Sequence, residues 1–168
     1  THRLFSSDKD LSSSLINDVF QDSYGMIWIA TEDGLNRYDG AKFTVYRRCN
    51  DRPNGLAHNF VNSVFEDKDR NLFIGTHNGA QMYNRDDDTF SPPAVFDSNG
   101  KSHTGNIKSF FQRDNGEIWI VGNITAPIKS IENGKIKVRH IPESRKLFGF
   151  SHQGIEDSAG NIWIIKDE

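Results

Sequence analysis

The stretch DSYGMIWIATEDGLNRY, residues 22 to 38, is the most informative part of this sequence about its architecture. It alternates short apolar runs with turns rich in Asp and Gly, which predicts strand, tight turn, strand, tight turn and strand. Similar segments recur later in the chain, as DKDRNLFIGTHNGAQMY from Asp67 to Tyr83, as RDNGEIWIVGN from Arg113 and as DSAGNIWII from Asp157. The chain is therefore organised as a repeat.

The spacing of the copies is regular. The aromatic residue at the centre of the motif recurs as Trp28, Phe73, Trp119 and Trp163, at steps of 45, 46 and 44 residues. Several further residue types keep the first step, namely Leu11 with Leu56, Asn17 with Asn62, Val19 with Val64, Thr31 with Thr76 and Gly34 with Gly79. Periods of this length with strand content indicate propeller blades, each a four-stranded antiparallel sheet.

The first unit divides into four strands, over residues 16–21, 26–31, 35–38 and 42–47. Their turns follow known preferences: Asp22 and Gly25 fit the first and fourth places of a type I turn, and Gly34 can adopt positive φ. The second strand, MIWIA, is apolar on both faces, whereas a half-exposed strand alternates. Such a strand is expected between two neighbouring blades, where burial of Trp28 stabilises the fold by about 2–3 kcal/mol.

These units predict an all-β fold, a partial β-propeller of about three complete four-stranded antiparallel blades plus part of a fourth. The units cover residues 11–47, 56–91, 105–140 and 150–168, and residues 2–6 form a leading outer strand. Closed propellers have about 4 to 8 blades, so this chain cannot close an ordinary ring alone. Either it is a piece of a longer chain, which we expect, or copies associate to cover the open apolar faces.

Two departures from the repeat carry their own predictions. Arg70 stands where the first unit has Gly25, and because an Arg at positive φ costs about 1 kcal/mol, we expect a different turn there. In the third unit GNITAP replaces ATEDG, with Pro127 in the place of Gly34, so this loop is rebuilt. After this loop the third unit is again in register with the first, since Ile131 occupies the repeat position of Tyr38.

Composition narrows the class of protein. The chain has 168 residues, a net charge of -3 and basic residues spread along its length, which argues against a nucleic-acid or anionic membrane partner. No apolar run approaches the roughly 20 residues that span a bilayer, and no signal peptide is visible. If the parent protein is exported, its signal is not in this chain. The single cysteine, Cys49, excludes an internal disulfide and is interpreted as incidental.

Motifs for catalysis and metal binding are not evident. The run Asp67-x-Asp69-x-Asn71 begins like a calcium loop, but Leu72 and Asn78 stand where an EF-hand needs Gly and Glu. The six histidines show no zinc spacing, and no nucleophile elbow occurs. We therefore predict no catalytic residue, metal or cofactor, and interpret the repeated Asp residues as turn builders.

A ligand is expected where the repeat fails, because rigid strands hold variable loops at one end of a blade. These loops are residues 48–60, 91–105 and the short turns near residues 32, 77 and 123. Their irregular polar residues are the candidate ligand-binding residues: Arg52, His58, Asn59, His77 and Asn123. The alternative is that each is an ordinary solvated loop residue.

The stretch from Leu11 to Gly40 resembles the two-component regulator propeller repeat, through the pattern D-x-x-G-x-I-W-I-A-T-x-x-G-L-N-R-Y-D-G. The resemblance is close over residues 11–83 and partial over residues 107–165. In that family the repeat builds the N-terminal sensor region of hybrid two-component histidine kinases, and the leading strand completes the last blade of a ring.

The resemblance implies a periplasmic sensing domain of an inner-membrane protein that detects glycan-derived oligosaccharides, signals as a homodimer through a phosphorelay and regulates glycan utilisation. The remaining propeller blades and the catalytic kinase domains are then expected elsewhere in the parent chain, so this chain is not itself an enzyme. Two alternatives stay open, a propeller lyase or hydrolase with a site on the ring axis, and a protein-interaction scaffold.

Overall fold

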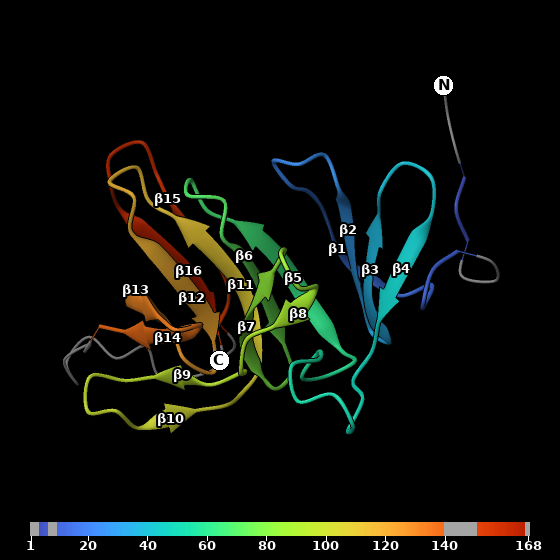
Figure 1. The fold of residues 1–168 in the computed structure, drawn as a ribbon. Helices are drawn as coiled ribbons and strands as arrows, with labels where there is room; N and C mark the ends of the chain where they lie inside the picture. The colour runs from blue at the N-terminus through green and yellow to red at the C-terminus, as the bar shows by residue number, and fades with distance from the viewer. Residues whose placement is uncertain (1–3, 7–9, 140–150, 167–168) are drawn as a thin grey trace.

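A computed structural model describes residues 4–6, 10–139 and 151–166, and within them all regular structure is β (Figure 1). The first sheet holds β1 (Ile16–Gln21), β2 (Ile27–Thr31), β3 (Gly34–Tyr38) and β4 (Phe43–Tyr46), antiparallel and in chain order. The second repeats it with β5 (Val61–Glu66), β6 (Leu72–Thr76), β7 (Gly79–Asn84) and β8 (Thr89–Phe90). The strands of the first blade match their predicted ranges to within one residue.

The third blade is larger than predicted. Its repeat strands are β11 (Ile107–Gln112), β12 (Ile118–Gly122), β13 (Ala126–Glu132) and β14 (Lys135–Val138). The segment 91–105, which we expected to be a loop, contributes β9 (Val95–Phe96) and β10 (Ser102–His103). Strand β9 pairs in parallel with β14, so the sheet has the order β10-β9-β14-β13-β12-β11. The expectation of a loop is therefore wrong for part of this segment.

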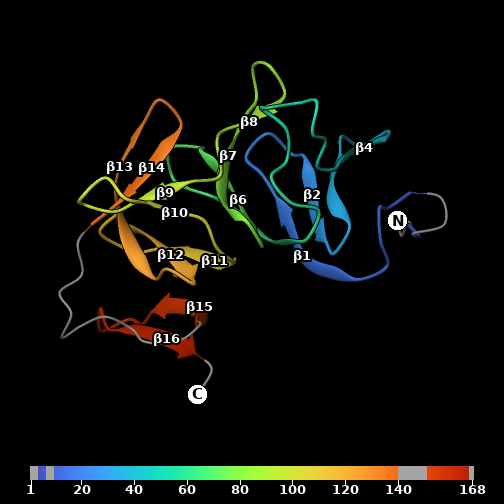
Figure 2. The same cartoon turned by 90° about the horizontal axis from the view of Figure 1, so that it is seen from below.

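The fourth unit is a hairpin of β15 (Ser151–Glu156) and β16 (Ile162–Lys166). Strand β1 contacts β5, β5 contacts β11 and β11 contacts β15, so the first strands of successive units are neighbours. Seen from below, the four sheets follow one another around an open arc (Figure 2). This is the partial propeller that the repeat predicts.

Four predicted boundaries reach beyond the described residues. The ends of the third and fourth units, at 140, 150 and 167–168, lie outside them, as do residues 2 and 3 of the predicted leading strand. Residues 4–6 of that segment carry no strand, and Phe5 packs on Tyr38 and Phe43 with ring centroids 5.1 and 5.0 Å away. The leading outer strand stays a prediction.

The same pairing irregularity recurs in the first strand of every unit. The outermost pairs are Ile16 with Thr31, Val61 with Thr76, Ile107 with Gly122 and Ser151 with Lys166, and the register shifts directly after each. A bulge leaves one residue out of the ladder and re-aims its side chain. These bulge residues are Asn17, Asn62, Lys108 and His152.

Bulge and turn residues join neighbouring blades. The Asn17 Nδ2 donates to the Val61 carbonyl at 2.7 Å, and the Asn62 Nδ2 donates to the Ile107 carbonyl at 2.8 Å. At the other end of the strands, a Glu or Gln accepts a backbone N–H from the preceding blade, in the pairs Ser23 to Glu66, Lys68 to Gln112 and Asp114 to Glu156. The first three blades are thus fixed to one another at both ends of their first strands, and the fourth unit is fixed to the third blade through Glu156.

The core lies between blades, as the two-sided apolar strands predict. Trp28, Leu72, Phe73 and Ile120 are all fully buried. One cluster joins the first two blades around Trp28, and a second joins the second and third blades around Phe73. The two end sheets keep apolar side chains in solvent, with Val19 of β1 and Trp163 of β16 each 60% exposed.

The prediction of a different turn at Arg70 is wrong. Arg70 adopts φ of +66°, close to +83° for Gly25, and its N–H donates to the Asp67 carbonyl at 3.0 Å. The Asp67 carboxylate fixes the turn by accepting the N–H groups of Asp69 and Asn71 at 2.9 and 2.8 Å. The Arg70 carbonyl also accepts from Arg85 Nη1 at 2.9 Å. These contacts offset the strain of the left-handed conformation.

The rebuilt loop of the third unit behaves as predicted. Residues 123–125 connect β12 to β13, and the register then returns, with Ile131 opposite Ile136 just as Tyr38 is opposite Phe43. No helix that is long and apolar enough to cross a membrane occurs among the described residues.

Candidate functional site

The connections between second and third strands, and those between blades, lie at one end of the sheets, which we call the loop face. The antiparallel order of each blade places them there. The longest described connection, residues 47–60, runs from β4 to β5. Loops held by a rigid sheet are where binding residues concentrate.

The first hollow on the loop face, the Arg48 hollow, has a volume of about 460 Å³. Its lining residues are Arg48, Asn50, His58 and Asn59. Two of the five predicted candidates, His58 and Asn59, therefore share one site. Arg48 and Asn50 were missed, although both lie in the connecting segment that the sequence singled out.

The second hollow, the Arg52 hollow, has a volume of about 240 Å³. It shares Arg48 and Asn50 with the first, so the two hollows adjoin. Its polar and charged lining includes Arg52 and Asn78, and its apolar lining includes Pro53 and Pro93. Arg52, a third predicted candidate, thus lies beside His58 and Asn59 on the loop face.

Asn59 ties the loops together. Its Oδ1 accepts the N–H of Arg48 at 2.8 Å, and its Nδ2 donates to Asp33 Oδ1 at 3.1 Å. Asp33 also forms an ion pair with Arg47 at 3.1 Å. Both ends of the Asn59 amide are engaged, which favours a structural role in shaping the hollow.

His58 has one nitrogen committed to the backbone. Its Nδ1 accepts the N–H of Phe60 at 2.9 Å, so the neutral ring carries its proton on Nε2. The His58 ring lies 5.6 Å from the His77 ring, and the Phe60 ring stacks on His77 at 3.8 Å. The structure therefore brings His77 against His58, although His77 is not among the residues that line either hollow.

His77 lies in an unusual environment. Its Nε2 is buried and has no hydrogen-bond partner among the described residues. Burial lowers the pKa of His77, and the nearby charges of Lys108 and His58 lower the pKa further. The ring is therefore neutral at pH 7 and acts as an aromatic support for Phe60.

Asn123 is apart from the other four candidates. Its N–H donates to the Asn106 carbonyl at 2.8 Å, and it packs against Gly105, where an added Cβ would lie 3.1 Å from its own Cβ. It belongs to the connection that leads into β13, in the third blade. Within the described residues, Asn123 supports the close approach of two loops.

A hollow of about 400 Å³ lies against the first strands of the blades. Its lining includes the bulge residues Asn17, Asn62, Lys108 and His152. The two Asn side chains join blades through backbone carbonyls. Lys108 and His152 replace Asn at the same position of the later units, and the Lys108 Nζ donates to Asn62 Oδ1 of the preceding blade at 3.2 Å. The sequence analysis missed these four bulge residues because a β-bulge is visible only in the register of the paired strands.

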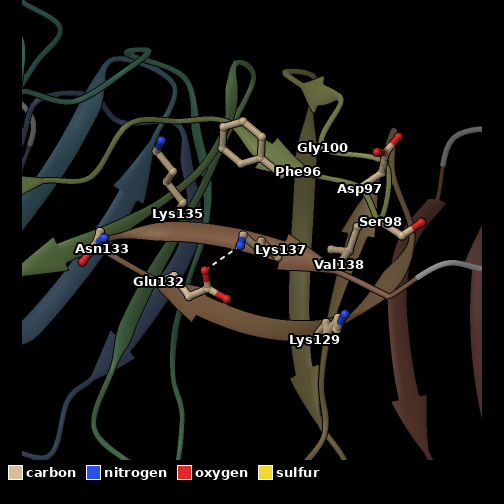
Figure 3. A pocket seen from close by; sticks show the side chains of 10 residues that line it. All are labelled: Phe96, Asp97, Ser98, Gly100, Lys129, Glu132, Asn133, Lys135, Lys137 and Val138. Atoms are coloured by element: carbon tan, nitrogen blue, oxygen red, sulfur yellow. Dashed lines mark hydrogen bonds and ion pairs between the residues drawn. The ribbon is translucent and has the colours of Figure 1, made fainter.

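A further hollow of about 410 Å³ lies between the β9–β10 hairpin and strands β13 and β14 (Figure 3). Lys137 pairs with Glu132 at 2.5 Å, and the Lys135 Nζ lies 5.6 Å from the centroid of the Phe96 ring. Asp97 is bound by His103 at 2.9 Å, and His103 is the main cause of the lowered pKa of Asp97. Much of the charge in this hollow is thus matched internally.

Among the described residues, no three His, Cys, Asp or Glu side chains lie together in a position to hold a metal ion. The run from Asp67 to Asn71 uses its carboxylate to cap the turn, as interpreted from the sequence.

Comparisons with known proteins agree with this architecture. Residues 10–33 and 55–78 match the family model described as "Two component regulator propeller". A curated relative, histidine kinase P4 of Formosa agariphila, is 49% identical over 37 residues, which is 22% of this chain and 3% of the relative.

Two solved structures resemble most of the chain. The extracellular domain of the hybrid two-component system BT4673 of B. thetaiotaomicron matches 89% of this chain at 25% identity, with a TM-score of 0.72. The extracellular domain of the hybrid two-component system BT3049 of the same organism matches 96% of this chain at 22% identity, with a TM-score of 0.78. At this identity the match shows a shared fold. The chain spans only 22% and 23% of these two domains.

Proposed function

We propose that this chain, which carries repeats of the two-component regulator propeller family, is part of the extracytoplasmic sensing region of a hybrid two-component histidine kinase in the inner membrane. Its ligand is an oligosaccharide released from a glycan. Binding adjusts a phosphorelay that regulates use of that glycan. The chain binds and does not catalyse, and the kinase domains lie elsewhere in the parent protein.

The shared fold carries this proposal. The extracellular domain of BT4673, a hybrid two-component system, has the same arrangement of blades over 89% of the chain. The position of the irregular residues adds support. The blades repeat their Asp, Gly and Trp residues, whereas Arg52, His58 and Asn59 gather at adjoining hollows on the loop face.

The way the blades are joined suggests how a ligand changes the state of the protein. The connection 47–60 is tied to the first blade through Asn59 and Asp33 and leads into the second blade. A ligand that binds better to one arrangement of the blades or of a dimer shifts the population toward it. We propose that this shift, transmitted through a homodimer, is the signal.

The test uses the complete extracytoplasmic region of the parent protein, because this chain spans only part of such a region. A panel of neutral and acidic oligosaccharides is screened by thermal shift and followed by calorimetry. A ligand at 100 times its Kd stabilises the folded state by about 2.7 kcal/mol, which raises Tm measurably. The proposal fails if no oligosaccharide stabilises the region and a substrate of another class is turned over.

A matched pair of variants locates the site. His58→Ala changes the Arg48 hollow, whereas Lys68→Gln changes an exposed side chain in the turn between β5 and β6, at the opposite end of the blade. We expect H58A to weaken binding and K68Q to leave it unchanged. Equal affinity in both variants contradicts the placement of the ligand on the loop face.

A further inference from the structure

The two adjoining hollows on the loop face have an unbalanced charge. Arg48 lies in the lining of both, Arg52 in the lining of one and His58 in the lining of the other. Among the described residues that line them there is no Asp or Glu. The chain as a whole has a net charge of -3, so this cationic composition is a local property of the site.

The guanidinium groups of Arg48 and Arg52 are not used to hold the fold. Both side chains are exposed, and neither makes a hydrogen bond or an ion pair with another described residue. Their neighbour Arg47 is different, because it pairs with Asp33 at 3.1 Å and also donates to the Asp33 carbonyl at 3.0 Å.

The acidic groups nearest in sequence do not neutralise the site. Asp33 is occupied by Arg47 and by the Asn59 amide. Asp51 stands next to Arg52 in the chain but is not among the residues that line either hollow. The two arginines therefore face the hollows with their charge unmatched within the described residues.

Arginine suits one class of ligand. Its planar guanidinium offers parallel N–H donors that match the two oxygens of a carboxylate or the oxygens of a sulfate ester. The amide of Asn50, shared by both hollows, can bond sugar hydroxyls, and Pro53 and Pro93 give the Arg52 hollow apolar surface for a ring.

We infer that the Arg48 and Arg52 hollows together bind an acidic oligosaccharide, with each arginine pairing to a carboxylate or a sulfate ester on a successive sugar. The inference rests on the proposed function and adds to it the chemical class of the ligand. It also assigns two positions, one of which, Arg48, sequence reasoning did not select.

The experiment measures Kd by calorimetry on the complete extracytoplasmic region, for oligomers of matched length in three arms. One arm is an oligouronate, the second a sulfated oligosaccharide and the third the neutral counterpart of each. The proteins are the wild type, Arg48→Gln, Arg52→Gln, Arg52→Lys and, as a charge-matched control, Lys68→Gln in the turn between β5 and β6. Thermal melting of each variant confirms that it is folded.

The wild type is expected to bind at least one acidic oligomer about tenfold or more tightly than its neutral counterpart. R48Q and R52Q each weaken that binding by about 10- to 100-fold, because each removes a charge-assisted pair. R52K recovers part of the affinity, since it keeps the charge without the fork, and K68Q changes nothing. Whichever acidic arm binds identifies carboxylate or sulfate as the recognised group.

Two results overturn the inference and leave the proposed function in place. In the first, the wild type binds neutral oligomers as tightly as acidic ones. In the second, R48Q and R52Q lose the same factor of affinity for neutral and for acidic oligomers. If no oligosaccharide binds in any arm, the inference fails. The proposed function fails with it when the wider oligosaccharide panel also gives no stabilisation and a substrate of another class is turned over.

Discussion

The indole N–H of Trp28 donates to the carboxylate of Asp22, six residues earlier, with 2.9 Å between Nε1 and Oδ2. The other oxygen of Asp22 accepts the N–H groups of Tyr24 and Met26, both at 3.0 Å. One carboxylate therefore fixes both the tight turn and the rotamer of the largest core side chain. Asp157 and Trp163 repeat this relationship at 2.8 Å.

The units that lack either the Asp or the Trp of this pair form a different hydrogen bond in the same turn. In the second unit Phe73 cannot donate, and the Asn71 Nδ2 donates to Asp67 at 2.8 Å instead. In the third unit Arg113 replaces the Asp, and Trp119 donates to Glu117 at 2.9 Å. The β9–β10 hairpin has the same pattern, because Asp97 accepts from Asn99 and Lys101 and pairs with His103, six residues later.

Replacing Asp22 with Ala is expected to lower the free energy of unfolding by about 3 kcal/mol, because the buried Trp28 N–H loses its acceptor. Urea unfolding measures the loss. The same substitution beside Trp28→Phe, which copies the second unit, tests the cause. If the D22A loss is undiminished in the W28F background, the indole hydrogen bond is not responsible.

The acid stability of the fourth unit is expected to depend on Asp157. The Trp163 and Asn161 hydrogen bonds lower the pKa of Asp157 to about 2, from 3.8. Because the folded-state pKa is the lower one, the ionised group stabilises the fold above pH 4, and this contribution is lost as the pH falls through 2. Asp157→Asn removes the titration, so its stability should fall less steeply between pH 5 and pH 2. Parallel pH profiles for the two proteins would rule this out.

At Arg70, glycine is expected to be better tolerated than alanine. Both substitutions remove the Arg70 guanidinium, which lies 5.8 Å from the Tyr24 ring centroid, but only alanine keeps the strain of a φ of +66°. R70G should therefore be more stable than R70A by about 1 kcal/mol. Chemical denaturation of the two variants gives the difference, and equal midpoints would contradict a strained turn.

Gly79 and Gly25 provide a matched pair for steric cost. Both have positive φ, but an added Cβ would meet the Pro93 carbonyl oxygen at 2.0 Å at Gly79 and nothing within 4 Å at Gly25. Gly25→Ala is expected to cost about 1 kcal/mol from backbone strain alone. Gly79→Ala adds a clash with backbone and should cost about 2–4 kcal/mol. Thermal melts in which both variants lose the same stability would contradict this close approach.

The strands of the first blade were predictable because turn chemistry and apolar runs agree at every boundary. Asp22 with Gly25 and the turn ending at Gly34 fix the ends of β2 to within a residue. The same reasoning failed at Arg70, because a turn held by its Asp tolerates a residue that local preference disfavours. It also missed β9 and β10, whose two-residue strands are too short for periodicity to register.

The candidate site was predictable in position but not in detail. Non-repeating polar residues in the loops pointed to His58, Asn59 and Arg52, which line adjoining hollows. The sequence alone could not show that the Asn59 amide is already hydrogen-bonded to Arg48 and Asp33. It therefore could not distinguish Asn59 from residues whose donors are available to a ligand. That distinction depends on contacts between loops of different blades.

The parallel pairing of β9 with β14 has a consequence for how this protein behaves in a crowded solution. Without it, β14 would present an edge of unpaired N–H and C=O groups, which is a template for addition of a foreign strand. With β9 and β10 in place, the sheet ends in the two residues Ser102 and His103. An edge strand of two residues has few unpaired N–H and C=O groups with which another chain could pair. The hairpin therefore protects the third blade from aggregation through its edge.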